Sequence, residues 1–110
     1  MKSKVFPYES IKTQDLGGGV SRKVLAYCQE MMIVEVSFEK GGVGTVHKHS
    51  HIQNTYVKEG KFEFSIEGEV VTVSPGDTIT FASNAEHGTL CLEKGVLIDI
   101  FTPMREDFLS

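Results

Sequence analysis

Short stretches of alternating apolar and polar residues, separated by turn-forming residues, run through almost the whole chain and limit its fold class. The clearest is 62–66, where phenylalanine and isoleucine alternate with glutamate and serine. Because successive side chains of a β-strand point to opposite faces, this period of two predicts a strand with one buried face. Further strands are predicted at 20–27, 31–39, 55–57, 70–73, 78–81, 89–92 and 96–101.

Turn signals, most of them containing glycine, separate nearly all of these predicted strands. They lie at 17–19, 41–42, 59–61, 67–68, 74–77, 84–86 and 94–95. About eight short strands at such regular spacing predict an all-β sandwich or barrel. A chain of 110 residues is long enough for one core but not for two, so we expect a single domain over residues 1–110. Only 103–109 has the character of a helical turn.

Composition and charge argue against several classes of function. The formal net charge of -4 disfavours nucleic-acid binding, which needs a basic patch. No apolar run approaches the roughly 20 residues of a membrane span, and 1–9 has no long apolar region typical of a signal peptide. Cys28 and Cys91 lack the spacing of a CxxC site or of a dense disulfide framework. We expect reduced, buried thiols in a cytoplasmic protein, with a single disulfide between them as the alternative.

Four residues in two separate segments have the chemistry and spacing of a metal site. His47 and His49 are two residues apart, so on a strand they would point to the same face. Gln53 follows closely, and His87 comes much later in the chain. Three imidazole nitrogens and an amide oxygen form a donor set for a borderline divalent cation. These residues predict one bound divalent transition-metal ion, with nickel, iron, manganese, zinc and copper all compatible.

The neutral charge of this donor set bears on what the ion would do. Three imidazoles and an amide leave its charge uncompensated, which makes it a stronger Lewis acid than an ion with a carboxylate ligand. Four protein ligands also leave open positions if the ion is five- or six-coordinate. The alternative is a closed site that only stabilises the fold. His51 is expected at a turn on the rim of the site, with direct contact to metal or ligand as its alternative.

Asp99 and Arg105 are the next candidates. Asp99 interrupts an otherwise apolar strand, and its parity places it on the same face as Phe101. A carboxylate that faces a barrel interior is unfavourable unless it is paired or functional. Burial would raise its pKa, and a nearby cation would lower it. Arg105 lies just beyond, where it can hold a carboxylate group in a bidentate pair. The alternatives are an outward-facing Asp99 and a surface Arg105 that pairs with a neighbouring acidic residue.

The last predicted strand is apolar on both faces. Val96, Ile98 and Ile100 fall on one face, and Leu97 and Phe101 lie on the other. A strand of a small barrel with two apolar faces needs cover on the outside as well as the inside. A second copy of the chain would supply this cover, so we expect a homodimer.

Together these features resemble the cupin superfamily. Its first motif is a glycine, an HxH pair, a glutamate and a second glycine, and its second motif is a glycine, a PxG sequence and a histidine. The first is matched by Gly41, His47, His49, Gln53 and Gly60, and the second runs from Gly76 to His87. Gln53 replaces the usual glutamate, and Ala82 and Asn84 replace proline and glycine. The resemblance implies a single-domain cupin, an antiparallel jelly-roll β-barrel with its metal-binding core at about residues 20–102.

Three further segments, at 21–27, 35–41 and 102–108, resemble the small KdgF-type cupins of pectin and alginate degradation. Glutamine at the fourth ligand position is itself a feature of that group. The resemblance implies a metal-dependent isomerase that opens 4,5-unsaturated monouronates to linear 5-keto-4-deoxyuronates. It also implies catalytic roles for three residues. Asp99 would transfer protons, Arg105 would orient the substrate carboxylate, and Phe101 would pack beside the sugar ring.

Two other classes of function remain open. A metal-dependent dioxygenase is one, although such enzymes usually have a carboxylate ligand that Gln53 does not supply. A non-catalytic cupin that binds a sugar or another metabolite is the other.

Overall fold

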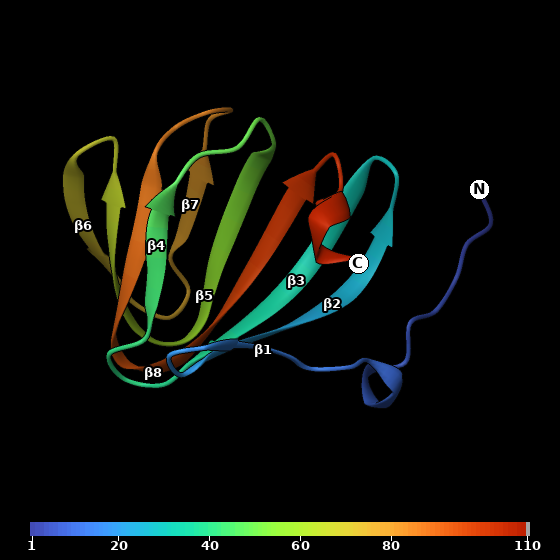
Figure 1. The fold of residues 1–110 in the computed structure, drawn as a ribbon, viewed down its shortest axis with the longest axis horizontal. Coiled ribbons are helices and arrows are strands. Elements are labelled where there is room, and N and C mark those ends of the chain that lie inside the picture. The colour runs from blue at the N-terminus through green and yellow to red at the C-terminus, as the bar shows by residue number, and fades with distance from the viewer. Residues whose placement is uncertain (110) are drawn as a thin grey trace.

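The structure is a computed structural model that describes residues 1–109, and it confirms the predicted all-β fold. Eight antiparallel strands form one strongly curved sheet (Figure 1). Their bounds are β1 Gln14–Gly17, β2 Val20–Cys28, β3 Met31–Phe38, β4 Val43–His47, β5 Ile52–Ile66, β6 Glu69–Val73, β7 Thr78–Phe81 and β8 His87–Thr102. Two single 3-10 turns are also present, η1 (Tyr8–Ser10) and η2 (Glu106–Phe108), and η2 lies where the helical turn is predicted. Among residues 1–109 no helix is long and apolar enough to cross a membrane.

The two longest strands, β5 and β8, connect the two halves of the barrel. They pair along their lengths, from Ile52 opposite Thr102 to Ile66 opposite His87. Each strand changes its other partner halfway: β5 pairs first with β7 and then with β6, and β8 pairs first with β4 and then with β3. The strands β2 and β1 extend the sheet beyond β3. This exchange of partners curls the sheet into the jelly-roll barrel that the resemblance implies (Figure 1).

Gly60 and Gly95 mark the place where both long strands are irregular. The turns predicted around these glycines are wrong, because β5 and β8 continue through them with shifts in register. Gly60 has a φ of 81°, which glycine adopts without strain. A Cβ atom on Gly60 would lie 2.5 Å from the Lys94 carbonyl oxygen, and one on Gly95 would overlap the Glu59 carbonyl oxygen. The two backbones therefore approach too closely here for any side chain.

Two of the observed strands, β1 and β4, are absent from the prediction. Both are short, and their side chains are mostly exposed. A strand without a buried face has no reason to alternate apolar and polar residues, so its period of two is lost. The omission of β4 affects the site directly, because this strand ends at His47.

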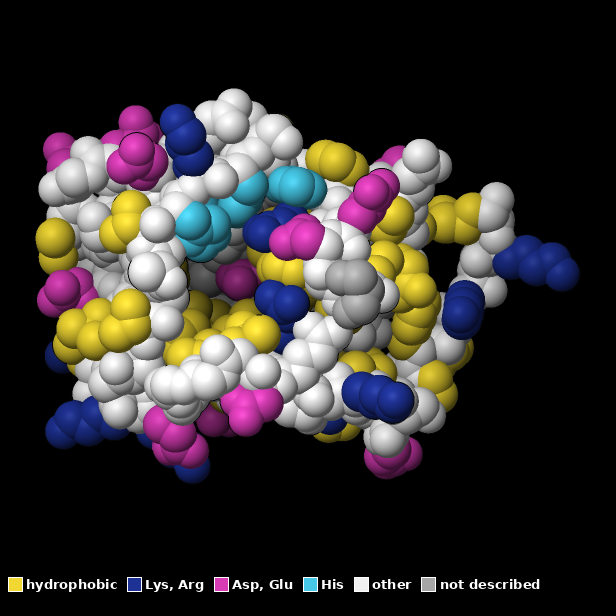
Figure 2. Space-filling model, viewed as in Figure 1, with side chains coloured by type: hydrophobic (Ala, Val, Ile, Leu, Met, Phe, Trp, Pro, Cys, Tyr) yellow, Lys and Arg dark blue, Asp and Glu magenta, His cyan; other side chains and the backbone are white. Residues whose placement is uncertain are grey.

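The inward-facing side chains form two hydrophobic clusters. The larger is built around Phe62 and Phe81, and the smaller contains Met32, Val34 and Phe101. Side chains from both clusters, together with residues of the C-terminal segment, line a cavity of about 380 Å³. Figure 2 shows this face of the molecule, with histidines along the rim of a hollow. Side chains therefore fill only part of the barrel interior.

Both cysteines are free thiols, as expected, and the alternative disulfide is not formed. Cys91 is buried, and its Sγ donates a hydrogen bond to the Glu93 carbonyl oxygen at 3.0 Å. Burial raises the pKa of the Cys91 thiol, which keeps it protonated. Cys28 is half-buried near the end of β2.

Candidate functional site

The four candidate metal ligands come from three parts of the barrel and meet at one end of the cavity. His47 is the last residue of β4, and it lies opposite His87, the first residue of β8. His49 lies in the loop after β4 rather than on the strand, so the expected shared strand face applies to His47 alone. One ligand nitrogen from each of these three histidines lies within 4.8 Å of the other two. Gln53 reaches the cluster from the start of β5, with Oε1 3.0 Å from His49 Nε2.

Backbone carbonyl groups determine which nitrogen each histidine offers. The Nδ1 of His47 donates to the Thr45 carbonyl at 2.7 Å, and the Nδ1 of His87 donates to the Ala85 carbonyl at 2.9 Å. His49 donates in the same way to a carbonyl oxygen at 3.2 Å. Because a carbonyl oxygen can only accept, each Nδ1 carries the proton and each Nε2 of the neutral ring keeps its lone pair. This arrangement is typical of histidines that bind a metal through Nε2.

The environment also favours the neutral form of His49 and His87. Burial lowers the pKa of His49 most, and the nearby Arg105 guanidinium lowers it further. Burial likewise lowers the pKa of His87, with a smaller contribution from His47. Neutral imidazoles at near-neutral pH are the form that a metal requires.

The amide of Gln53 is oriented by a hydrogen bond at its far side. Its Nε2 donates to the Thr55 hydroxyl at 3.0 Å, which turns Oε1 towards His49. In the tautomer set by the carbonyl groups, Oε1 and His49 Nε2 face each other as two acceptors without a proton between them. A cation between these lone pairs would satisfy both. The residues present therefore fit a divalent transition-metal ion, and this donor set does not identify which one.

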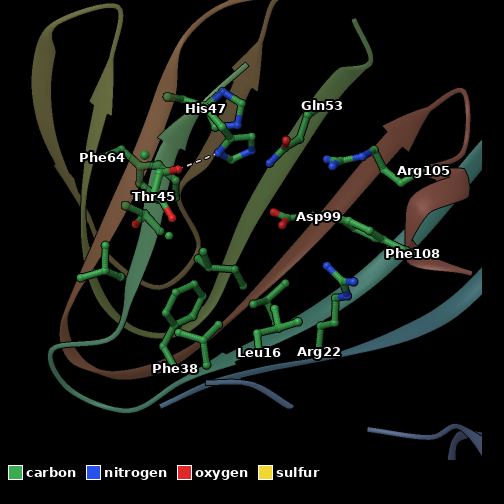
Figure 3. A pocket seen from close by; sticks show the side chains of 18 of the residues that line it. Leu16, Arg22, Phe38, Thr45, His47, Gln53, Phe64, Asp99, Arg105 and Phe108 are labelled. Carbon is green, nitrogen blue, oxygen red and sulfur yellow. Dashed lines mark hydrogen bonds between the residues drawn. The ribbon is translucent and has the colours of Figure 1, made fainter. Parts of the chain in front are cut away.

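Asp99 lies in the second half of β8 and lines the same cavity (Figure 3). Its Oδ1 accepts a hydrogen bond of 2.7 Å from the Thr55 hydroxyl, and Thr55 is itself buried. Burial raises the pKa of Asp99 from 3.8 to about 6, against the opposing effects of Thr55, Gln53 and Arg105. A carboxyl group with such a pKa can both accept and donate a proton near neutral pH.

The C-terminal segment closes one side of the cavity. The Arg105 guanidinium donates from Nε and Nη2 to the two carboxylate oxygens of Asp107, at 3.1 and 3.0 Å. This is the surface pair that stood as the alternative for Arg105, yet only 14% of the Arg105 side chain is exposed and it also lines the cavity. Phe101 is buried, with its ring 5.8 Å from that of His49 and 5.6 Å from that of Phe108.

His51 lies beside the cluster rather than within it. Its ring centroid is 5.3 Å from that of His49, and its Nε2 donates to the Met104 carbonyl at 3.1 Å. The other ring nitrogen is buried and has no hydrogen-bond partner among residues 1–109. His51 therefore links the loop that carries His49 to the C-terminal segment, in agreement with its expected place at the rim.

Arg22 and Phe108 also line the cavity, and neither is among the sequence-based candidates. Arg22 lies on β2, and its guanidinium carbon lies 3.7 Å from the centroid of the Phe108 ring. The available signal is parity, because Arg22 shares a strand face with Val20 and Val24, as Asp99 shares one with Phe101. Phe108 gives no such signal, since its position depends on how the C-terminal segment folds back over the barrel.

The sequence profile of the family described as "Cupin domain" matches residues 34–101. Pectin degradation protein KdgF of Dickeya dadantii (strain 3937) is 46% identical over 98 residues, which cover 87% of this chain and 89% of that protein. Among solved structures, KdgF from Halomonas sp. is 38% identical with a TM-score of 0.91, covering 97% of this chain and 99% of that one. An RmlC-like cupin from Shewanella frigidimarina NCIMB 400 is 37% identical with a TM-score of 0.92, covering 97% and 96% of the two chains.

Proposed function

This chain belongs to the cupin family, and we propose that the cavity of its barrel is the active site of a KdgF-like enzyme of pectin catabolism. The enzyme opens 4,5-unsaturated monouronates to linear 5-keto-4-deoxyuronates. The observation that supports this placement of the site is one cavity lined by His47 and His87 of the histidine cluster, by Gln53 and by Asp99. A volume of about 380 Å³ is of the size that small-molecule sites have in proteins and leaves room for a monosaccharide.

The reaction is an isomerisation in which one proton changes place. The substrate is a cyclic hemiacetal whose ring oxygen is attached to carbon 5 of a carbon–carbon double bond. Loss of the proton from the hydroxyl group at carbon 1 and cleavage of the bond between carbon 1 and the ring oxygen give an aldehyde and an enolate. Protonation at carbon 4 then gives the 5-keto-4-deoxy acid. The protein must therefore remove one proton and deliver one.

Asp99 is the proposed group for one or both of these transfers. Its carboxyl group lies in the cavity, and its pKa of about 6 allows both protonation states near neutral pH. The hydrogen bond from Thr55 holds Oδ1, which leaves Oδ2 to face the substrate. One well-placed acid–base group typically contributes about 10²–10⁴ in rate.

His47, His49, Gln53 and His87 are the proposed ligands of one divalent ion, and nickel, zinc, iron and manganese all remain candidates. Such an ion would supply Lewis-acid stabilisation of negative charge on substrate oxygens. Phe101 is proposed to pack beside the sugar ring, and Arg105 to contact the substrate carboxylate from the mouth of the cavity. Elemental analysis of protein purified without added metal would identify the ion.

Absorbance of the conjugated double bond and carboxylate tests the function directly. Metal-loaded protein added to freshly prepared unsaturated galacturonate should remove this ultraviolet band well above the spontaneous rate. Chelation should abolish the acceleration, and restoring the metal should return it. No acceleration with any of several divalent metals would contradict the proposed reaction.

We retain the homodimer as a proposal. The outer face of β5 exposes Ile52 and Tyr56, and Tyr56 lies opposite the half-buried Ile98 of β8. Ile100 continues this apolar outer surface along β8. A second copy of the chain would cover it. Light scattering after size exclusion should give the mass of a dimer, and Ile52→Glu should reduce it to that of a monomer.

The two free thiols support a proposed cytoplasmic location. Cys28 and Cys91 are unpaired, as is usual in a reducing compartment. Fractionation of cells that express the full chain from its own gene would test this, and recovery with secreted or periplasmic proteins would contradict it.

A further inference from the structure

The Arg22 side chain enters the cavity from the strand opposite the histidines. Arg22 lies on β2, and its neighbours on the same strand face, Val20 and Val24, are apolar. It pairs across the sheet with Val36 of β3, which also lines the cavity. Figure 3 shows its guanidinium pointing into the open space below Asp99. Arg22 is therefore a half-buried charged side chain in the wall of the cavity, beside apolar neighbours.

Most of the hydrogen-bonding capacity of this guanidinium is unused within the protein. An arginine has five N–H donors. The Nε of Arg22 donates to Gln14 Oε1 at 2.6 Å, and Gln14 Nε2 donates in turn to the Phe108 carbonyl at 3.0 Å. Among residues 1–109 the two terminal NH₂ groups of Arg22 form no hydrogen bond or ion pair. The bond to Gln14 therefore occupies one of the five N–H donors of Arg22, and four N–H donors remain.

The charge of Arg22 is also poorly compensated. Burial lowers its pKa, and this effect outweighs the opposing influence of Asp107. Arg105 differs, because both oxygens of Asp107 already occupy two of its donors. Phe108 lies between the two guanidinium groups, with its ring centroid 3.7 Å from the Arg22 carbon and 4.3 Å from the Arg105 carbon (Figure 3). Of the two arginines, Arg22 therefore has its terminal NH₂ groups free for a planar anion.

We propose that Arg22 is the residue that selects an acidic sugar, by binding the substrate carboxylate through its two terminal NH₂ groups. The inference rests on the proposed function for the identity of the ligand as a uronate. The stacked Phe108 ring and the bond to Gln14 hold the guanidinium plane in place, so little rotational freedom is lost when the anion binds. Arg105 closes the cavity and adds charge, and it has a secondary part in recognition.

Equilibrium binding of two inert sugars tests this without any turnover. Galacturonate and galactose differ in having a carboxylate or a hydroxymethyl group at carbon 5, and neither contains the reactive double bond. Nuclear magnetic resonance titration of metal-loaded wild-type protein should show a preference for galacturonate. Arg22→Gln should reduce the ratio of the affinities for galacturonate and galactose by about 10- to 100-fold, the range expected for charge-assisted hydrogen bonds. Arg22→Lys should retain part of it.

Two matched variants separate recognition from general effects. Lys23→Gln removes a positive charge from the next residue of β2, whose Nζ binds the Ile11 carbonyl at 3.1 Å outside the cavity, and it should leave the preference unchanged. Arg105→Gln should weaken the preference less than Arg22→Gln. If wild type shows no preference, or if Arg105→Gln removes it while Arg22→Gln does not, the inference is wrong.

Kinetics with the unsaturated uronate add a second readout. Arg22→Gln should raise KM strongly with a smaller change in kcat, whereas a merely structural role would lower the melting temperature without changing the choice between the two sugars. If wild type turns over no uronate but still prefers galacturonate through Arg22, the proposed function fails and this inference stands. Should Arg22→Gln not fold, Arg22→Lys and the two control variants still decide between the arginines.

Discussion

The Thr55 hydroxyl donates a 2.7 Å hydrogen bond to Oδ1 of Asp99, and this contact connects the two halves of the candidate site. The same hydroxyl accepts a bond from Gln53 Nε2 at 3.0 Å. A buried chain of donors therefore runs from a proposed metal ligand to the proposed acid–base group. When Asp99 is ionised, the direction of this chain is fixed, because a carboxylate can only accept.

Replacing Thr55 with valine should move the pH dependence of the reaction. The hydroxyl stabilises the charged form of Asp99, so its loss should raise the pKa of that carboxyl group. The acidic limb of kcat/KM would then shift to higher pH. Thr80→Val is the matched control, since the Thr80 hydroxyl bonds Asn54 on the exposed outer face. An acidic limb that stays in place would contradict the assignment of Asp99 as the titrating group.

Replacing Asp99 with alanine should nearly abolish turnover while the metal stays bound. We expect kcat to fall by a factor of about 10²–10⁴, because one acid–base group is removed. The metal should stay bound, because the three histidines are unchanged. Absorbance of the substrate double bond measures the first effect, and elemental analysis of the purified variant measures the second. Activity within about tenfold of wild type would refute the role of Asp99.

Metal-free protein should gain stability when Asp99 is replaced by asparagine, but only at high pH. The pKa of Asp99 is about 6 in the folded protein and 3.8 without its environment, so the folded state holds the proton more tightly. This contribution to stability is fully present below pH 3.8 and is lost as the pH rises to about 6. Above that, the ionised group destabilises the fold by up to about 3 kcal/mol.

Urea denaturation in the presence of a chelator would measure the effect of this substitution at about pH 4 and about pH 8. Asp99→Asn should exceed wild type in free energy of unfolding at the higher pH and match it at the lower one. Equal stabilities at both values would mean that the carboxyl group is better solvated than its burial implies.

Replacing His87 and His51 separately with alanine should show which of them binds the metal and which only lies beside it. His87→Ala deletes an Nε2 of the cluster and should abolish stoichiometric metal binding. His51→Ala should keep the metal, because His51 bonds the Met104 carbonyl instead. Elemental analysis and competition with a chelator would measure both. Metal loss in His51→Ala equal to that in His87→Ala would show that His51 belongs among the ligands.

Substitution of two glycines with similar backbone geometry should have very different effects. Gly60 and Gly68 both have positive φ, at 81° and 86°. Alanine at Gly68 meets no atom within 4 Å, so we expect a loss of about 1 kcal/mol from the backbone conformation alone. Alanine at Gly60 would also collide with the carbonyl groups of Lys94 and Glu93. Chemical denaturation should show a loss at least twice as large for Gly60→Ala.

The strands whose residues alternate were predictable, since a buried face imposes a period of two. β2, β3, β6 and β7 lie within a residue or two of their predicted bounds. The long strands β5 and β8 were each divided in two, because Gly60 and Gly95 have the same signature whether they form a turn or let two strands approach closely. Local sequence cannot distinguish these cases, as the colliding atoms belong to a distant segment.

In the candidate site, too, some contacts were predictable from local sequence and others depend on distant segments of the chain. The spacing of His47 and His49 was enough to predict that both lie near His87, although His49 lies beyond the end of the strand. The contribution of Phe108 was not predictable, because it depends on a C-terminal turn that packs against β1 and β2 through Gln14 and Arg22. Contacts of this kind exist only once the chain has closed.

The pairing of β5 with β8 also predicts an order of assembly. These strands are joined through β6 and β7, so Ile66 and His87 are the paired residues closest in sequence, and Ile52 and Thr102 are the farthest apart. Closing the shorter loop loses less chain entropy, and we expect pairing to begin there and to propagate outwards. Substitutions near Phe64 should then slow folding more than substitutions near Leu97 do. The end of β8 that carries His87 would form early, and the contact between Thr55 and Asp99 would form among the last.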